Sequence, residues 1–285
     1  MKNYLIDLYQ FYKNPNDKRI KDYSLNKNII YILYTSLVDF AIFLLLFPFL
    51  HYLLENNLIP EDIEKISYKD NTIVSSIIII AVLVPIMEEM IFRLPLRYNR
   101  FYALFLPRKI WNYIFKVLIY SIPFIFGIVH LTNYGEITLS LLKMAPILIG
   151  SQIIGGYLFT FLRVRFNFIS AVLSHCLWNL SITIYLLITS SFEKPYSQTT
   201  EKYDIKIKYF EYNNIEKQKF VIDSSKNRIF RIEANQYSIN HLVDSLTNKE
   251  RKKTDFIIDL KLESKKGITK DEFIDIIKRY DLNNK

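Results

Sequence analysis

The sequence predicts a mainly α-helical, polytopic membrane protein of about five to six spans, followed by a small soluble α+β domain. Hydrophobic residues make up 51% of the chain and aromatic residues 15%, a richer apolar content than is usual for soluble proteins. In the first two-thirds they form runs of about 20 residues, long enough to cross a hydrocarbon core of roughly 30 Å as helix. The last third is polar, so two regions with different solvents are expected.

The formal net charge of +9 does not indicate a nucleic-acid partner. The basic residues lie mainly between the apolar runs and in the polar tail, where they act as topology determinants and solvated surface. Cys176 is the only cysteine, which excludes an internal disulfide and a site with several cysteine ligands. These observations leave membrane functions as the class to consider.

The chain divides into an N-terminal segment at 1–27, a helical membrane domain at 28–190 and a soluble domain at 191–285. The first segment is amphipathic and then polar, which suits either a short helix on the membrane face or a loose terminus. It lacks the short apolar core of a cleavable signal peptide. The first span therefore serves as the insertion signal.

Five apolar runs are the expected membrane spans: Asn28–Leu54, Thr72–Tyr98, Trp111–His130, Ile137–Leu162 and Asn167–Ile188. An acidic polar loop follows the first of them. Basic residues crowd the end of the second span and the N-terminal segment, which places both in the cytoplasm by the positive-inside rule. Five crossings leave the tail outside the cell, whereas a separate half-helix at Tyr98–Leu106 would change that side.

The tail opens with a polar linker, Ser191–Lys202, and continues in β-forming and helix-forming stretches. The expected strands are Ile205–Tyr212, Lys219–Ile222, Arg228–Glu233 and Asp255–Leu262. The expected helices are Ser238–Leu246 and Thr269–Tyr280, the second with Thr269 and Glu272 as a capping box. No catalytic motif is visible in this region.

The second span contains the run VPIMEEMIFRLPLRYNR, which places two adjacent glutamates and an arginine inside lipid. Such charges are costly there unless they are paired or functional. Glu89 and Arg93 are four residues apart, so they can form an ion pair on one helix face. Glu88 is rotated by about 100° and points elsewhere. We therefore expect a structural Glu89–Arg93 pair and a Glu88 carboxylate available for chemistry.

Pro85 should kink this helix beside Glu88, because it cannot donate to the carbonyl of Ala81. A carboxylate held in the resulting apolar space suits a general base. By itself, however, this span is equally compatible with a Glu–Arg pair that only locks helices together. Asp39, in the middle of the first span, is expected to pair with Arg93 or with a backbone donor.

Two of the four histidines also lie in apolar spans. His130 closes the run FIFGIVH, one helical turn after Phe126. His175 and Asn179 are four residues apart in SHCLWN, so both side chains project from one face. A lone buried histidine is more often structural than catalytic, but three such polar elements in order, each in its own apolar span, indicate a common site.

In this order the motifs EExxxR, FxxxH and HxxxN, each on its own hydrophobic helix, resemble the CAAX-prenyl-protease and bacteriocin-processing family of type II CAAX endopeptidases. Each motif alone is weakly specific, and the ordered set is strong. The resemblance covers roughly Thr72–Ile188, and the tail lies beyond it.

The resemblance implies water-mediated peptide hydrolysis within the membrane. Glu88 and His130 would position and deprotonate the water, while His175 and Asn179 would donate hydrogen bonds to the oxyanion. Glu89 and Arg93 would be the structural half of the first motif. We expect no tightly bound catalytic metal, since HExxH is missing; zinc held by Glu88, His130 and His175 is the alternative.

The expected protein is thus an intramembrane endopeptidase of a bacterial inner membrane, with a cytoplasmic N-terminus. Its partners would be membrane lipid and a membrane-bound or lipidated peptide substrate, not necessarily prenylated, and no nucleic acid. The alternative is a non-catalytic membrane scaffold or immunity-type protein that keeps the motif residues as a polar network. A proton-coupled transporter is disfavoured, because no internal repeat accompanies the spans.

Overall fold

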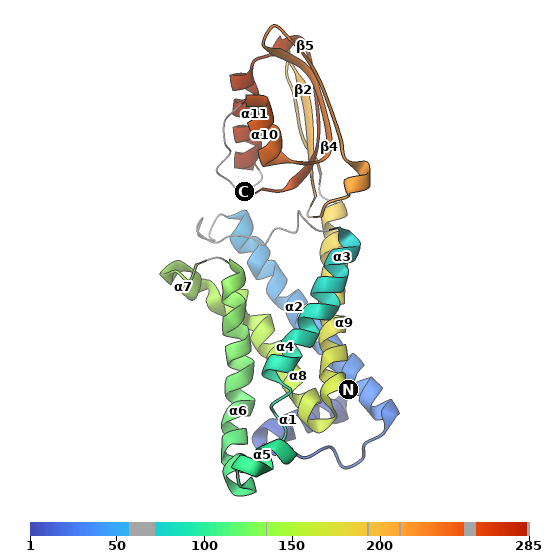
Figure 1. Ribbon diagram of the computed structural model, residues 1–285, viewed down its shortest axis with the longest axis vertical. Helices are drawn as coiled ribbons and strands as arrows, with labels where there is room; N and C mark the ends of the chain where they lie inside the picture. The colour runs from blue at the N-terminus through green and yellow to red at the C-terminus, as the bar shows by residue number, and fades with distance from the viewer. Residues whose placement is uncertain (57–71, 135, 193, 211, 248–254, 284–285) are drawn as a thin grey trace. The chain divides into compact units, whose positions relative to one another are not determined.

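The computed structural model describes residues 1–56, 72–134, 136–192, 194–210, 212–247 and 255–283 (Figure 1). Most of the acidic loop expected after the first span lies outside these residues. The chain forms two compact units, one from Met1–Glu64 and Ile77–Tyr185, the other from Lys65–Ser76 and Leu186–Lys285. We refer to them as the helical unit and the C-terminal unit.

The first two-thirds of the described chain is helical. Its elements are α1 (Lys2–Lys13), α2 (Leu25–Glu55), α3 (Ile73–Ile78), the π-helix η1 (Ile79–Leu83), α4 (Val84–Phe92), α5 (Arg100–Phe105), α6 (Arg108–Val129), the 3-10 helix η2 (His130–Tyr134), α7 (Leu139–Leu148), α8 (Gly150–Arg165) and α9 (Phe168–Ser191). Four stretches are long and apolar enough to cross a membrane, namely Leu25–Leu53, Ile73–Phe92, Arg108–Tyr134 and Phe168–Thr189. Helices α7 and α8 provide a fifth if the bent pair is one span.

The fourth span was predicted as one continuous helix, and this was wrong, because it is divided into α7 and α8, which meet at an angle of 51°. Pro146 in α7 has no N–H for the carbonyl of Leu142, and α7 ends two residues later at Leu148. The second span was predicted six residues too long. Pro95 cannot donate to Ile91 and disfavours helical geometry at Leu94, so α4 ends at Phe92.

The N-terminal segment forms a helix that packs into the helical unit. Tyr4 and Phe11 of α1 are fully buried, and the Tyr4 hydroxyl lies 3.0 Å from Thr35 Oγ1 of α2. The carboxylate of Asp17 accepts a hydrogen bond from Trp111 Nε1 at 2.9 Å and pairs with Arg108 at the start of α6. The segment is therefore not a loose terminus.

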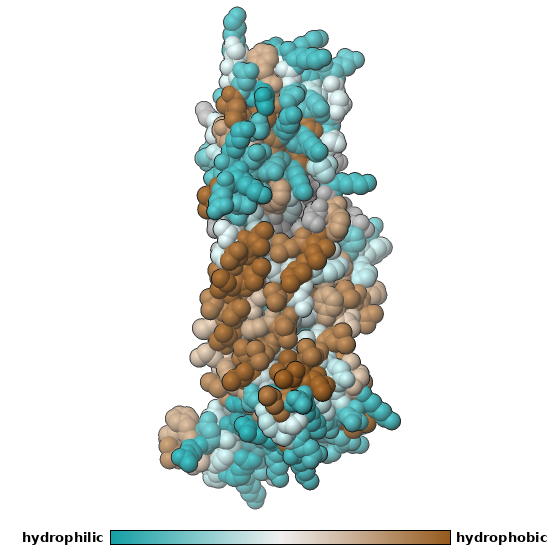
Figure 2. Space-filling view, turned by 90° about the vertical axis from the view of Figure 1, so that its right-hand side faces the viewer, coloured by the Kyte–Doolittle hydropathy of each residue, from teal (hydrophilic) through white to brown (hydrophobic). Residues whose placement is uncertain are grey.

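Hydrophobic side chains form a band over the middle of the helical unit, and hydrophilic side chains gather at the end where α1 and α5 lie (Figures 1 and 2). Large apolar side chains are exposed on its helices, among them Leu45, Ile91 and Val117. Exposed apolar surface on this scale fits contact with lipid. Helix α5 has six residues, too few to cross a membrane.

The C-terminal unit is an antiparallel five-stranded sheet in the order β1-β2-β5-β4-β3. The strands are β1 (Tyr196–Thr199), β2 (Asp204–Phe210), β3 (Lys219–Ser225), β4 (Arg228–Ser238) and β5 (Ile257–Ile268). Helices α10 (Ile239–Thr247) and α11 (Lys270–Asn283) lie on the same side of the sheet (Figure 1). Their apolar faces bury Ile232, Leu260 and Phe273 in one core.

Strands occur at all four places where the tail was predicted to form them, and both helices are present. Strand β1 was missed, because its sequence YSQT is polar and was interpreted as linker. The predicted capping box is present: Thr269 N–H donates to Glu272 Oε2 at 2.9 Å, and Glu272 N–H donates to Thr269 Oγ1 at 3.2 Å. Lys226 and Asn227 join β3 to β4 with positive φ, as a type I′ turn requires.

Candidate active site

The motif helix α4 carries a fully buried ion pair. Glu89 Oε1 lies 3.1 Å from Arg93 Nη1, and both side chains are 0% exposed. The Arg93 guanidinium also lies 3.8 Å from the ring centroid of Phe126 on α6. Within the described residues none of its nitrogens has an aligned hydrogen-bond acceptor. Charge attraction and the ring face therefore hold Arg93, and the geometry agrees with the predicted i, i+4 pair.

Glu88 projects from a different face of α4 and lies close to both motif histidines. Its Oε1 lies 3.7 Å from His130 Nε2, and its Oε2 lies 3.4 Å from His175 Nε2. The Glu88 side chain is 23% exposed, whereas that of His175 is 4% exposed. The fold thus brings together side chains from α4, the end of α6 and α9, as the site hypothesis requires.

The second nitrogen of each ring fixes the protonation pattern. His130 Nδ1 lies 2.7 Å from the carbonyl oxygen of Phe126, which can only accept, so the proton is on Nδ1. His175 Nδ1 lies 3.0 Å from Glu89 Oε1, the carboxylate paired with Arg93. In the neutral rings both Nε2 atoms therefore present lone pairs toward Glu88. Three acceptor groups, the Glu88 carboxylate and the two imidazoles, therefore lie close together, and such a cluster can bind a hydrogen-bond donor such as water.

Asn179, one turn after His175 on α9, is directed to the backbone of the motif span. Its Nδ2 donates to the carbonyl of Ile80 at 2.8 Å. Ile80 lies in the π-helix, where its partner five residues on is Pro85, which has no N–H. Asn179 thus supplies a donor where the predicted kink removes one. The structure thus shows the Asn179 amide bonded to a backbone carbonyl, and its oxyanion role stays a prediction.

Helix α8 supplies two site neighbours that the sequence reasoning missed. Phe159 stacks on the ring of His175, with centroids 4.6 Å apart and an interplanar angle of 19°. Arg163 donates from Nε to the carbonyl of Arg93 and from Nη2 to that of Leu94, both at 2.9 Å. The available signal was the i, i+4 spacing of an aromatic residue and an arginine in an apolar helix, but the basic residues between the apolar runs, Arg163 among them, were interpreted only as topology determinants.

The expected partner of Asp39 was wrong. Its side chain is fully buried, and neither carboxylate oxygen has a hydrogen-bond partner among the described residues. It faces Gly155 of α8, where an added Cβ would lie 2.8 Å from Oδ2. Asp39 therefore sits at the α2–α8 contact and does not pair with Arg93.

The alternative zinc site would use Glu88, His130 and His175 as ligands. One carboxylate and two imidazoles with fixed Nδ1 partners are suitable ligand types. In the described part of the chain, however, no group of three or more His, Cys, Asp or Glu side chains is arranged to hold a metal ion. We therefore derive no step through a metal, and metal dependence stays a prediction.

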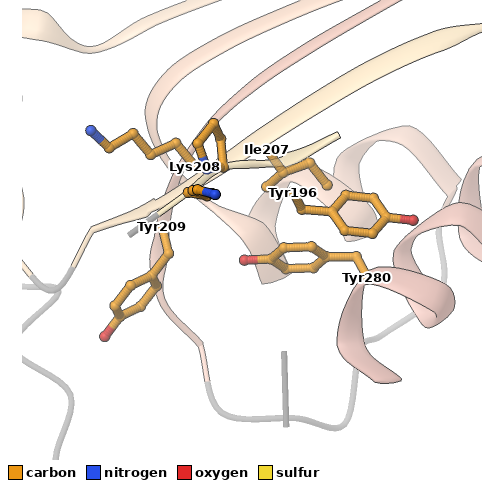
Figure 3. Close-up of a pocket in the computed structure, with 7 residues that line it drawn as sticks. Tyr196, Ile207, Lys208, Tyr209 and Tyr280 are labelled. Carbon is orange, nitrogen blue, oxygen red and sulfur yellow. The ribbon is translucent and has the colours of Figure 1, made fainter. Parts of the chain in front are cut away.

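The C-terminal unit contains a small pocket that is unrelated to these motifs. Its lining comes from Lys194, Pro195, Tyr196, Ile207, Lys208, Tyr209 and Tyr280 (Figure 3). The rings of Tyr196 and Tyr280 meet at 5.5 Å, edge to face. A cavity volume of about 30 Å³ is room for very few water molecules, so the pocket does not suit a peptide.

Comparison with known families agrees with the motif reading. Residues 70–181 match a family model described as type II CAAX prenyl endopeptidase Rce1-like. The match contains all three motifs and ends before the five-stranded sheet, so the predicted resemblance is confirmed over this stretch. No curated protein and no solved structure gives a match.

Proposed function

We propose that the protein is an intramembrane endopeptidase that hydrolyses peptide bonds of membrane-associated or lipidated proteins with a water activated by Glu88. One observation carries this proposal: the Nε2 lone pairs of His130 and His175 face the two oxygens of Glu88, at 3.7 and 3.4 Å. A water that donates to Glu88 and to one imidazole would be held with its oxygen lone pair directed at a substrate carbonyl.

In the first step, Glu88 takes a proton from this water as the oxygen adds to the peptide carbonyl. His130 positions the water, with its own tautomer fixed by the Phe126 carbonyl. In the second step, the protonated Glu88 gives its proton to the leaving nitrogen, the C–N bond breaks, and an acid and an amine are released. Glu88 returns to its starting state.

The developing oxyanion needs hydrogen-bond donors. Asn179 has two amide hydrogens, of which one is used on the Ile80 carbonyl, so the other would serve the oxyanion. His175 Nε2 has no proton in the neutral tautomer fixed by Glu89, so it would donate only after it takes up a proton. Asn179 is thus the main oxyanion donor in this proposal, and His175 acts chiefly on the water.

The test compares Glu88→Gln and His130→Ala with Glu201→Gln and His241→Ala, matched changes at exposed positions of the C-terminal unit. Each protein is purified in detergent and given two fluorogenic substrates, a prenylated peptide and an unprenylated transmembrane peptide. Cleavage of either substrate should disappear in the first two variants and persist in the controls. Equal cleavage by all four variants would refute the proposal.

A non-catalytic scaffold or immunity-type protein is the second candidate. The fully buried contacts of Glu89 with Arg93 and His175 favour it, since they would lock three helices together without any chemistry. In that case a cellular phenotype would follow Glu89→Ala and would be indifferent to Glu88→Gln. A phenotype lost with Glu88→Gln, in protein that still accumulates in the membrane, would exclude this candidate.

A further inference from the structure

The end of the motif helix α4 is a place where backbone carbonyls need donors. The helix stops at Phe92 because Pro95 has no N–H, and the last carbonyls of a helix have no intrahelical partner. Leu96 N–H donates to the carbonyl of Arg93 at 3.1 Å. Arg163 of α8 adds Nε on the same carbonyl and Nη2 on the carbonyl of Leu94, both at 2.9 Å.

Arg163 is buried, with 7% of its surface exposed. Within the described residues it forms no ion pair with a carboxylate, and its hydrogen bonds go to the backbone. A planar guanidinium that donates to two successive carbonyls fixes both their positions and their direction. Arg163 therefore acts on the backbone that follows Glu88 and Glu89, and not as a partner for another charge.

Phe159 lies one turn before Arg163 on the same face of α8. Its ring stacks on His175 at 4.6 Å, and the Arg93 guanidinium lies 5.9 Å from its centroid. One turn before Phe159, the same face of α8 makes a different contact: Gly155 faces Asp39 of α2. One face of α8 thus contacts two parts of the proposed site: the C-terminal end of α4, which follows Glu88, and the ring of His175.

We propose that Arg163 and Phe159 are positioning residues for the Glu88 site. Arg163 fixes the end of α4, and Phe159 fixes the plane of the His175 ring. Both act through Glu88 and His175 and neither touches the reacting atoms. This inference rests on the proposed peptidase function for its kinetic consequence, while the contact of Arg163 with α4 can be tested without any activity.

The experiment uses the full-length protein and four variants, Arg163→Gln, Arg163→Lys, Phe159→Leu and Arg165→Gln. Arg165 is the matched control, because it lies at the same end of α8 but donates to Asn16 Oδ1 and to the carbonyl of Lys18, at 2.9 and 2.8 Å. Three quantities are measured: kcat and KM per folded molecule, each across pH, and backbone hydrogen exchange in residues 89–98.

Arg163→Gln should lower kcat about 10- to 100-fold with KM unchanged, the effect expected when a catalytic group moves by about 1 Å. Its pH–rate profile should shift, and exchange at 89–98 should rise. Arg163→Lys, which lacks the two-pronged geometry, should fall between Arg163→Gln and the wild type. Arg165→Gln should match the wild type in kcat and in exchange at 89–98. Phe159→Leu should alter the pH–rate profile without raising that exchange.

Unchanged kcat in Arg163→Gln, or an equal loss in Arg165→Gln, overturns the proposal. If Arg163→Gln fails to fold, Arg163→Lys decides, and wild-type kcat with wild-type exchange overturns it. If the wild type shows no Glu88-dependent cleavage, the proposed function fails. Increased exchange at 89–98 in Arg163→Gln alone then still supports the contact with α4, and unchanged exchange refutes that contact as well.

Discussion

The buried pair of Glu89 and Arg93 should stabilise the fold, whereas Glu88 should not, and a double-mutant cycle can separate the two roles. The changes are Glu89→Gln, Arg93→Met and the combination of both. Each single change leaves one charge in a site that is 0% exposed, without the partner that lies 3.1 Å away in the wild type. Arg93 then keeps its aromatic neighbours, of which the ring of Phe126 is the nearest, and Glu89 keeps the imidazole of His175.

The magnitude follows from this burial. Removing one partner of a buried ion pair typically costs about 3–5 kcal/mol, because the remaining charge is uncompensated. At about 1.4 kcal/mol per factor of ten, the ratio of folded to unfolded protein falls by roughly two to four powers of ten. The double variant holds no charge, so it should lose much less than the sum of the two singles. Glu88→Gln, at a side chain that is 23% exposed, should change stability by less than about 1 kcal/mol.

The assay is reversible unfolding in mixed detergent micelles, followed by the fluorescence of Trp111 and Trp178, with cleavage measured on the same preparations. Glu88→Gln should be stable and inactive. The double variant should be more stable than Arg93→Met. Additive effects of the two singles, with a coupling below about 0.5 kcal/mol, would refute the reasoning, as would equal destabilisation by Glu88→Gln and Glu89→Gln.

Three further predictions concern packing, pH and metal. Gly156→Ala should destabilise the helical unit by about 1–3 kcal/mol in the same unfolding assay, since the new Cβ would lie 3.1 Å from the backbone of Pro123. Gly150→Ala is the control: the nearest atom to its new Cβ is a Leu46 methyl at 3.6 Å, so stability should not change. The Thr269 N–H and the Lys202 ammonium lower the pKa of Glu272. The stability that these two contacts give the folded state is fully present above the ordinary glutamate pKa of about 4.3, and it is lost as pH falls through the lowered pKa of Glu272. Glu272→Gln should therefore increase hydrogen exchange in α11 at pH 7 and have no effect near pH 2. Chelation with phenanthroline should leave Glu88-dependent cleavage unchanged, and loss of cleavage that zinc restores would contradict the metal-free prediction.

The helical periodicity of the sequence was sufficient to predict the roles of neighbours on one helix. The i, i+4 spacing of Glu89 and Arg93 predicted their contact, and the rotation of Glu88 predicted that it would face other partners. The order of the three motifs indicated one site. The predictions for Glu88, Glu89 and Arg93 depend on local helix geometry alone, which is why a single sequence supports them.

Interactions between helices could not be predicted in the same way. The sequence could not show that His175 Nδ1 meets Glu89, because 86 residues separate them. Arg163 looked like a topology signal, since its spacing from Phe159 does not show which other helix the two side chains contact. Asp39 was assigned a partner by its charge, and packing placed it against Gly155.

Breaks in regular structure were predicted only in part. Pro85 correctly indicated irregular geometry before Glu88, but the π-helical register and the use of Asn179 on Ile80 depend on a second helix. Strand β1 escaped notice because its sequence is polar, and an edge strand is stabilised by pairing with its neighbour.

By itself, the sequence determined which segments are apolar, which residues share a helix face and that the three motifs occur in one order, since these are properties of the local chain. The tertiary structure decided which nitrogen of each histidine faces Glu88, which helix supports the end of α4, and where Asn179 donates. The physical reason is that a hydrogen bond or ring contact depends on positions within a few tenths of an ångström, and only the packing of whole helices fixes those positions.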